Sequence, residues 1–130
     1  MFYQKVRHYH WNVTGPHFFT LHEQFEDLYT VWNDAIDEIA EQVQCRGDWP
    51  VHTLADILDL AQLDEDPSTP TADTMVRTIV ADLSALDEEV QALIDRAEAA
   101  DDARTAALLE DLRGQIADDR WMLRAWLEDL

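Results

Sequence analysis

A single long helix is the feature that most constrains how this chain can fold. Neither glycine nor proline interrupts the sequence from Leu21 to Val43, and apolar residues recur there every three or four positions, which is the pattern of an amphipathic helix. Thr20 followed by Glu23 predicts a capping box at its start. The apolar stripe consists of Leu21, Phe25, Leu28, Trp32, Ile36, Ile39 and Val43.

Four side chains of metal-binding type lie on the flank of this stripe. At about 100° per residue, His22, Glu26, Asp37 and Glu41 fall within roughly a quarter-turn of one another. His22 and Glu26 are one turn apart, and so are Asp37 and Glu41, so each pair could grip one ion. Glu26 and Asp37, however, are about 16 Å apart along the axis. One chain therefore offers two half-sites.

A second copy of the helix could complete both half-sites. His22 and Glu41 are equally far from the middle of the run, at residues 31–32, and so are Glu26 and Asp37. An antiparallel copy related by a two-fold axis at that point would place His22 opposite Glu41. The same axis would place Glu26 opposite Asp37, giving two identical sites at an isologous dimer interface. The alternative is a solvated acidic face, which better explains any one carboxylate alone; the complete set favours the interface.

These residues belong to blocks that resemble a known family. The sequence HWNVTGPHFF at 10–19, followed by LHE at 21–23 and IDEIAE at 36–41, resembles the signature of the Dps family, the mini-ferritins of starved or oxidatively stressed prokaryotes. The resemblance continues through Trp49-Pro50, Thr53-Leu54-Ala55 and the WMLRA sequence at 121–125. It covers nearly the whole chain.

The resemblance implies a fold and an assembly. The implied fold is all-α, a ferritin-like four-helix bundle with a short helix in the crossover between the second and third main helices. The implied assembly is a homo-oligomer, a dodecameric shell with di-iron ferroxidase sites at its two-fold interfaces. The implied ligands are His10, His22 and Glu26 from one subunit with Asp37 and Glu41 from its neighbour.

The resemblance also gives Trp11 a role, as a nearby electron donor that quenches stray oxidising equivalents; an ordinary buried aromatic is the alternative. Imidazole nitrogen and carboxylate oxygen suit Fe(II), with Mn and Zn as competitors, so the assignment of iron rests on the resemblance. The expected function is iron storage and detoxification under oxidative stress. Fe(II) would be oxidised, preferably by hydrogen peroxide, and stored as Fe(III) mineral inside the hollow shell.

Other function classes remain open. One is a DNA-binding, nucleoid-protecting protein, and another is a non-catalytic acidic helical assembly protein. A classical ferritin is discounted, because it would need Glu-x-x-His pairs inside one bundle and no glutamate here has a histidine three residues later.

The charge balance weighs against nucleic-acid partners. The chain has 28 acidic and 9 basic residues, a formal net charge of -19, which repels DNA and anionic membranes. We therefore expect no direct DNA binding. So acidic a chain also suggests the salt-rich cytoplasm of a halophile, with an acidic mesophilic protein as the alternative.

The remaining sequence predicts one ferritin-like domain over residues 1–130. No run is long enough for a transmembrane helix and no leader precedes Phe2, so we expect a soluble, cytoplasmic protein. The first helix should run from Met1 to about Val13 and is much shorter than in the family, as if truncated. A short helix should run from Leu54 to about Leu63, capped by Thr53.

A new helix should begin at Thr69-Pro70. It should break at 99–102, because continuing the same three- and four-residue spacing of apolar positions would place Asp101 in the core. A last helix follows the break. Cys45, the single cysteine, is predicted to be a free thiol near the end of the long helix.

Overall fold

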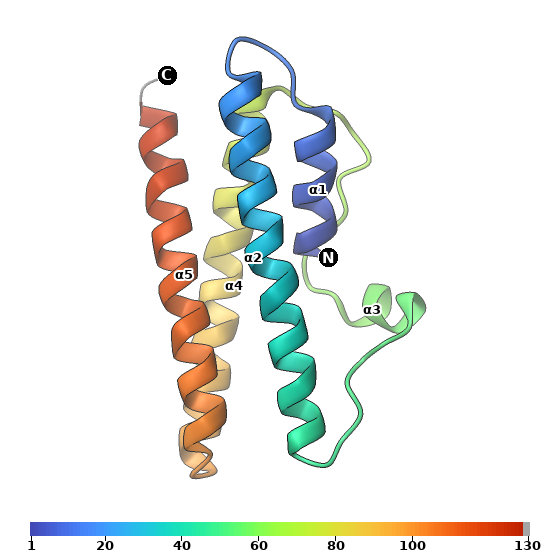
Figure 1. Cartoon of the computed structure of the whole chain (residues 1–130), viewed down its shortest axis with the longest axis vertical. Coiled ribbons are helices and arrows are strands. Elements are labelled where there is room, and N and C mark those ends of the chain that lie inside the picture. Colours follow the sequence, from blue (N-terminus) through green and yellow to red (C-terminus); the bar gives the residue numbers. More distant parts are fainter. Residues whose placement is uncertain (129–130) are drawn as a thin grey trace. The chain divides into compact units, whose positions relative to one another are not determined.

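Five helices account for most of the chain. The structure is a computed structural model that describes residues 1–128, and its helices are α1 (Phe2–Asn12), α2 (Phe18–Cys45), α3 (Leu54–Leu60), α4 (Ala72–Ala99) and α5 (Ala103–Glu128) (Figure 1). The chain divides into two compact units, the first covering Met1–Met75 and the second beginning at Val76. None of the described helices is long and apolar enough to cross a membrane.

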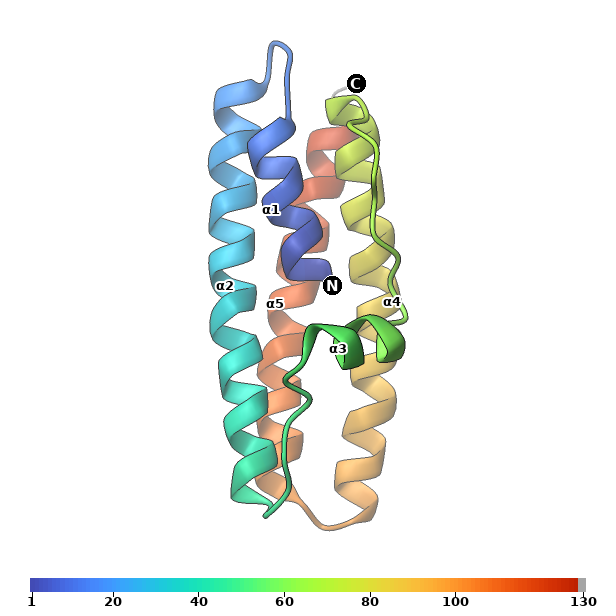
Figure 2. The same ribbon diagram turned by 90° about the vertical axis from the view of Figure 1, so that its right-hand side faces the viewer.

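In the first unit, α1 lies against the N-terminal half of α2 and runs antiparallel to it (Figures 1 and 2). The ring of Phe2 contacts that of Trp32 at a centroid distance of 4.8 Å, and Tyr9 contacts Phe25 at 6.2 Å. The predicted stripe of α2 is buried at Leu21, Phe25, Leu28 and Trp32. Ile36, another predicted member, is 48% exposed. The stripe is therefore confirmed only toward the N-terminal half of the helix.

The ends of α2 depend on local hydrogen bonds. The helix begins at Phe18 with His17 as N-cap and no side-chain cap, so the predicted capping box at Thr20 is wrong. The Thr20 hydroxyl lies inside the first turn and donates to the His17 carbonyl. At the other end, Cys45 is the last helical residue and an exposed free thiol, as predicted. Gly47 follows at φ 85°, a conformation that glycine adopts without strain.

The crossover that follows α2 contains the short helix α3 (Figure 2). It then passes beside α1 before α4 begins. Thr53 caps α3 as predicted, accepting a hydrogen bond from the Asp56 amide, but the helix ends at Leu60 instead of Leu63 because Ala61 is extended. Beyond it, the Tyr9 hydroxyl donates to Asp66 at 2.6 Å. Hydrogen bonds from Ser68 and Tyr9 lower the pKa of Asp66 to about 2. This ionised carboxylate therefore ties the crossover to α1.

The start of α4 differs from the prediction by two residues. The Thr71 hydroxyl accepts from the Thr74 amide, so Thr71 acts as the cap and α4 begins at Ala72. Pro70 precedes the helix. Thr71 therefore takes the capping role predicted for Thr69, and Pro70 lies outside the helix instead of at its first position.

The second unit contains most of α4 together with α5, which run antiparallel (Figures 1 and 2). The predicted break is confirmed: α4 ends at Ala99, Asp101 has φ 55°, and Asp102 caps α5 by accepting from the Thr105 amide. Asp87 on α4 binds Arg113 on α5 at 2.9 Å. The buried apolar side chains of this unit are Val76, Ile79, Leu83, Val90, Ile94, Ala97, Ala106, Leu109, Leu112, Ile116 and Leu123.

Asp119 on α5 is a buried carboxylate that should cost stability at neutral pH. It is 5% exposed; Gln115 donates to its Oδ1 at 3.0 Å, and Oδ2 has no hydrogen-bond partner among the described residues. Burial raises its pKa to about 6, a hydrogen bond from Gln115 opposes the shift, and the charge of Asp118 adds to it. Because the folded pKa lies above the unfolded one, the folded chain holds an extra proton between about pH 4 and 6, and the penalty applies in full only above this range.

Replacing Asp119 with asparagine should therefore raise the free energy of unfolding at pH 7 by up to about 3 kcal/mol. The gain should shrink toward zero as the pH falls to 4, because wild type is then protonated at this position. Denaturant unfolding of Asp119→Asn measures the difference, with exposed Asp111→Asn on the same helix as control. An equal gain at both pH values would contradict the assignment.

Candidate metal centre

Two histidines from different helices form the centre of the candidate site. His10, near the end of α1, is 7% exposed and His22, in the second turn of α2, is half-buried. Their rings stack at a centroid distance of 3.8 Å and an interplanar angle of 16°. His10 Nδ1 lies 2.6 Å from the His22 carbonyl, and His22 Nδ1 lies 2.7 Å from the His10 carbonyl. These two reciprocal hydrogen bonds are named here the histidine clasp.

The histidine clasp determines which nitrogen of each ring is free. A backbone carbonyl can only accept a hydrogen bond, so Nδ1 must carry the proton in both rings. In the neutral imidazole, the lone pair is then on Nε2, the nitrogen left for a metal ion. Carbonyl contacts of this kind fix the orientation of metal-binding histidines. Both predicted histidines are thus held in the tautomer that a metal site needs.

The three predicted carboxylates lie along one exposed face of α2. Glu26, Asp37 and Glu41 are all exposed, and α2 is a continuous helix from Phe18 to Cys45. Because an α-helix rises about 1.5 Å per residue, Asp37 and Glu41 lie at least about 16 Å along the helix axis from Glu26. Among the residues that the structure describes, no three His, Cys, Asp or Glu side chains come together closely enough to hold one ion. The structure brings His10 to His22, and places Asp37 and Glu41 in a separate group.

Aromatic side chains surround the histidine clasp. The ring of Phe18 stacks on His22 at 5.0 Å, and that of Tyr29 meets His10 edge-on at 5.3 Å. Trp11 is 54% exposed, so it is not the ordinary buried aromatic that the sequence left open. The Arg7 guanidinium carbon lies 4.9 Å from the centre of the Trp11 ring. Sequence reasoning missed Arg7 and Tyr29, although the four-residue spacing from Arg7 to Trp11 could have suggested their contact.

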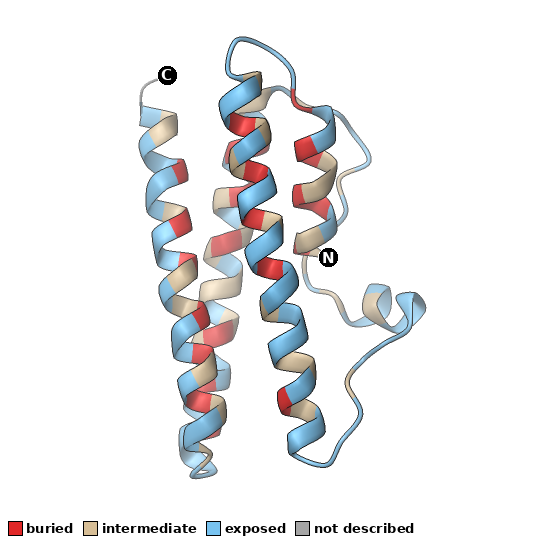
Figure 3. Ribbon diagram, viewed as in Figure 1, coloured by how far each residue is buried: buried red, intermediate tan, exposed pale blue. Residues whose placement is uncertain are grey.

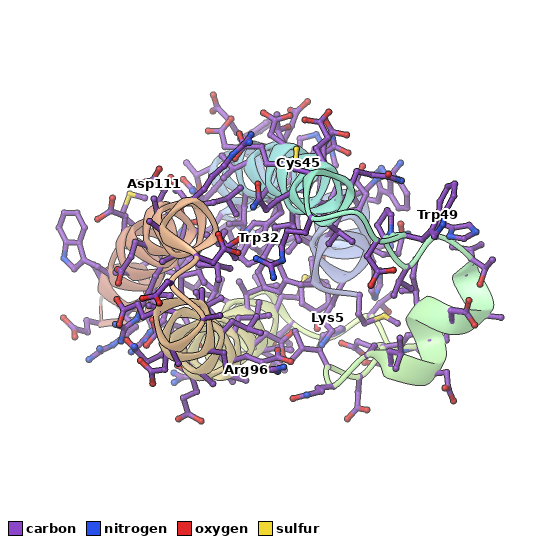
Figure 4. All side chains as sticks on the ribbon, turned by 90° about the horizontal axis from the view of Figure 1, so that it is seen from below. Lys5, Trp32, Cys45, Trp49, Arg96 and Asp111 are labelled. Carbon is purple, nitrogen blue, oxygen red and sulfur yellow. The ribbon has the colours of Figure 1, made fainter. Side chains whose placement is uncertain are left out.

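The first unit also exposes many large apolar side chains. On α2, Phe19 is 83% exposed, and Val31 and Ile36 are more than a third exposed. In the crossover, Trp49 is 80% exposed, and Figure 4 shows it pointing away from the helices. Most of α3 is also exposed (Figure 3). The exposed apolar residues of the crossover are Trp49, Val51, Leu54, Leu58 and Leu60. Side chains such as Phe19 and Trp49 would gain from burial against another protein, because their apolar area would leave water.

The chain matches a family model described as a ferritin-like domain over residues 1–130. It is 42% identical over 126 residues to a DNA protection during starvation protein from Brevibacillus brevis, an alignment that covers 97% of this chain and 85% of the relative. It is 38% identical over 125 residues to DNA protection during starvation protein 2 from Bacillus anthracis, covering 96% and 86%.

Solved structures agree. A crystal structure of a Dps protein from Bacillus brevis superposes with a TM-score of 0.95 at 41% identity, covering 97% of this chain and 85% of that one. Dps from Listeria innocua, soaked with zinc, gives 0.95 at 32% identity, covering 98% and 86%. The predicted fold class is confirmed: all-α and ferritin-like, with four main helices and the short α3 between the second and third. The chain belongs to the Dps family of ferritin-like proteins.

Proposed function

We propose that this protein is a ferroxidase that oxidises Fe(II), preferably with hydrogen peroxide, and stores the Fe(III) as mineral. The observation that carries the proposal is the histidine clasp, which leaves Nε2 of both His10 and His22 free to bind a metal ion. Glu26 follows His22 by one helical turn on α2 and has an exposed carboxylate. Imidazole nitrogen with carboxylate oxygen is a donor set that suits Fe(II). Structures of Listeria innocua relatives soaked with zinc and with cobalt are consistent with a family that takes up divalent metals.

Each complete site would form between two subunits. In an antiparallel pair of α2 helices, the Asp37 and Glu41 carboxylates of one subunit would face His10, His22 and Glu26 of the other. Two identical sites would result, as a two-fold axis requires. The exposed apolar residues of α2 and the crossover support such an interface, because Phe19 and Trp49, 83% and 80% exposed, would gain from burial against a second copy. We propose a homo-oligomer of this kind, built up to a dodecameric shell.

At such a site, two one-electron donors would meet one two-electron oxidant. The reaction is 2 Fe(II) + H2O2 + 2 H⁺ → 2 Fe(III) + 2 H2O, which consumes peroxide without releasing hydroxyl radical. The carboxylates would balance the charge that the irons gain, and the fixed Nε2 atoms would hold the ions in place. Iron storage and peroxide detoxification are then one activity.

The relatives are named for DNA protection during starvation. We propose that this chain would protect DNA indirectly, by removing iron and peroxide. A net charge of -19 opposes contact with a polyanion. We propose that it does not bind DNA directly. The same charge supports our proposal that the protein works in a salt-rich cytoplasm, where counterions screen the repulsion between subunits.

Oligomer size and iron oxidation should therefore fall together as salt is removed. Subunits that each carry a charge of -19 repel more strongly when the Debye length grows from about 3 Å at 1 M salt to about 10 Å at 0.1 M. Sedimentation and peroxide-driven Fe(II) oxidation, measured on the same samples across a salt series, test both properties. A dodecamer that oxidises iron in high salt is the expected result. A chain that stays monomeric and oxidises no iron above the buffer rate at any salt concentration would refute the proposed function.

A further inference from the structure

A groove on the second unit gathers three of the chain's nine basic residues. It runs along α5 next to Asp87 of α4, has a volume of about 560 Å³ and is lined by Arg113, Arg120 and Arg124. We call it the arginine groove. The chain as a whole has 28 acidic residues and a net charge of -19, so a concentration of guanidinium groups is the feature to explain.

Within residues 1–128, hydrogen bonds hold only one of the three arginines. Arg113 Nε donates to Asp87 Oδ1 at 2.9 Å, and its Nη1 donates to Gln91. Arg120 Nη1 lies 3.7 Å from Asp87 Oδ2, which is beyond hydrogen-bond distance. Arg124 is exposed and has no carboxylate within ion-pair distance among the described residues. Two guanidinium groups therefore retain donors for a further acceptor.

A large aromatic side chain borders the arginine groove. Trp121 is 69% exposed. The lining also includes Gly114 and Ala117, and a Cβ added at Gly114 would meet no heavy atom within 4 Å. The surface of α5 is thus open here. Tryptophan and arginine are the residue types that most often dominate the binding energy of protein interfaces.

The lining favours a protein over a small anion. Its three arginines are matched by three carboxylates, so its formal charge is zero and a small anion gains little net attraction. A protein partner would also bury the Trp121 ring, which stabilises a complex whatever the charge. Carboxylates near the groove would repel wrongly placed acids, so a partner is favoured only where its acids meet the arginines. The three carboxylates are Asp87, Glu110 and Glu128.

A closed shell needs a second kind of contact between subunits. An isologous two-fold interface joins two copies and leaves no part of itself for a third, because both copies contribute the same patch. A dodecamer therefore requires another surface on every subunit. A second copy of this chain, with a net charge of -19, is rich in the carboxylates that guanidinium groups bind.

We propose that the arginine groove joins two-fold dimers into the larger oligomer, with carboxylates of another copy of this chain bound by Arg120 and Arg124 and with Trp121 buried against that copy. The inference rests on the proposed ferroxidase shell. It identifies the surface that turns a ferroxidase into an iron store, since a dimer would contain both iron sites but would enclose no cavity.

The test is the oligomer formed by a groove variant. Arg124→Glu combined with Trp121→Ser should stop at the dimer in sedimentation, because contact between dimers should weaken about 30-fold or more, as for interface hot spots. Fe(II) oxidation per subunit should stay at the wild-type level, but the Fe(III) should precipitate instead of remaining in solution with the protein. Arg96→Glu is the matched control, since Arg96 is exposed and lies outside the groove lining. It should assemble as wild type does.

Hydroxyl-radical labelling, read by mass spectrometry, tests the same surface in the unaltered chain. Trp121 should be protected in the assembled wild-type oligomer, and dilution to dimers should restore its labelling. Equal labelling in both states would contradict the inference.

The failure of the inference can be told apart from that of the proposed function. Groove variants that assemble to wild-type size would overturn the inference and leave the ferroxidase function standing. If inorganic phosphate also bound wild type in calorimetry but did not bind Arg124→Glu, the groove would be the site of a small anion instead. A wild-type protein that assembles through the groove but oxidises no Fe(II) would refute the proposed function alone.

Discussion

Replacing His22 with alanine should lower peroxide-driven Fe(II) oxidation at least about 100-fold, since removing even a residue that only supports a metal ligand costs about 10- to 100-fold. Every site at a two-fold interface would lose one nitrogen ligand. The substitution would also remove one of the two hydrogen bonds of the histidine clasp. Stopped-flow absorbance of Fe(III) formation measures the effect.

Loss of the ligand and loss of the clasp can be separated. Asparagine at position 22 can still donate to the His10 carbonyl, because its amide nitrogen lies where Nδ1 lies, but it offers no nitrogen in place of Nε2. His22→Asn should therefore oxidise iron as poorly as His22→Ala while unfolding closer to wild type. His52→Ala is the control, since His52 is exposed and its Nδ1 lies 3.0 Å from the Pro50 carbonyl in its own loop. A wild-type rate in His22→Asn would show that the clasp matters and that Nε2 binds no iron.

The helices could be predicted from the sequence because their apolar periodicity depends on burial alone. The stripe of α2 at Leu21, Phe25 and Leu28 is buried as expected, and the break before α5 followed from the phase of the apolar residues. The helix ends were less accurate. Thr20 and Thr69 both had the composition of a cap, but capping depends on where the chain turns, and the structure uses His17 and Thr71 instead.

In the candidate site, too, the positions along one helix could be predicted from the sequence and the contacts between helices could not. The spacing of His22, Glu26, Asp37 and Glu41 on one helix follows from 3.6 residues per turn, so their shared face could be read from the sequence. The histidine clasp could not, because it depends on how closely α1 approaches α2. Arg7 also escaped notice: in so acidic a chain an arginine is expected to pair with a carboxylate, and the structure places it over rings.

Two inactive variants should recover part of their activity when they are combined in one oligomer. His22→Ala and Asp37→Ala should each be nearly inactive alone, since every site then lacks a ligand. In a mixed dimer, one site combines both altered positions and is doubly defective. The other combines the intact His22 of one subunit with the intact Asp37 of its neighbour. Random pairing of equal amounts should therefore restore about a quarter of the wild-type sites.

Co-refolding the two variants in equal amounts, with native mass spectrometry to confirm mixed dimers, is the most direct test of a site shared between subunits. The account predicts peroxide-driven Fe(II) oxidation at about a quarter of the wild-type amplitude, against almost none for either variant alone. A site within one chain would gain nothing from mixing. Activity that stays at the level of the separate variants, in samples where mixed dimers are present, would contradict the account.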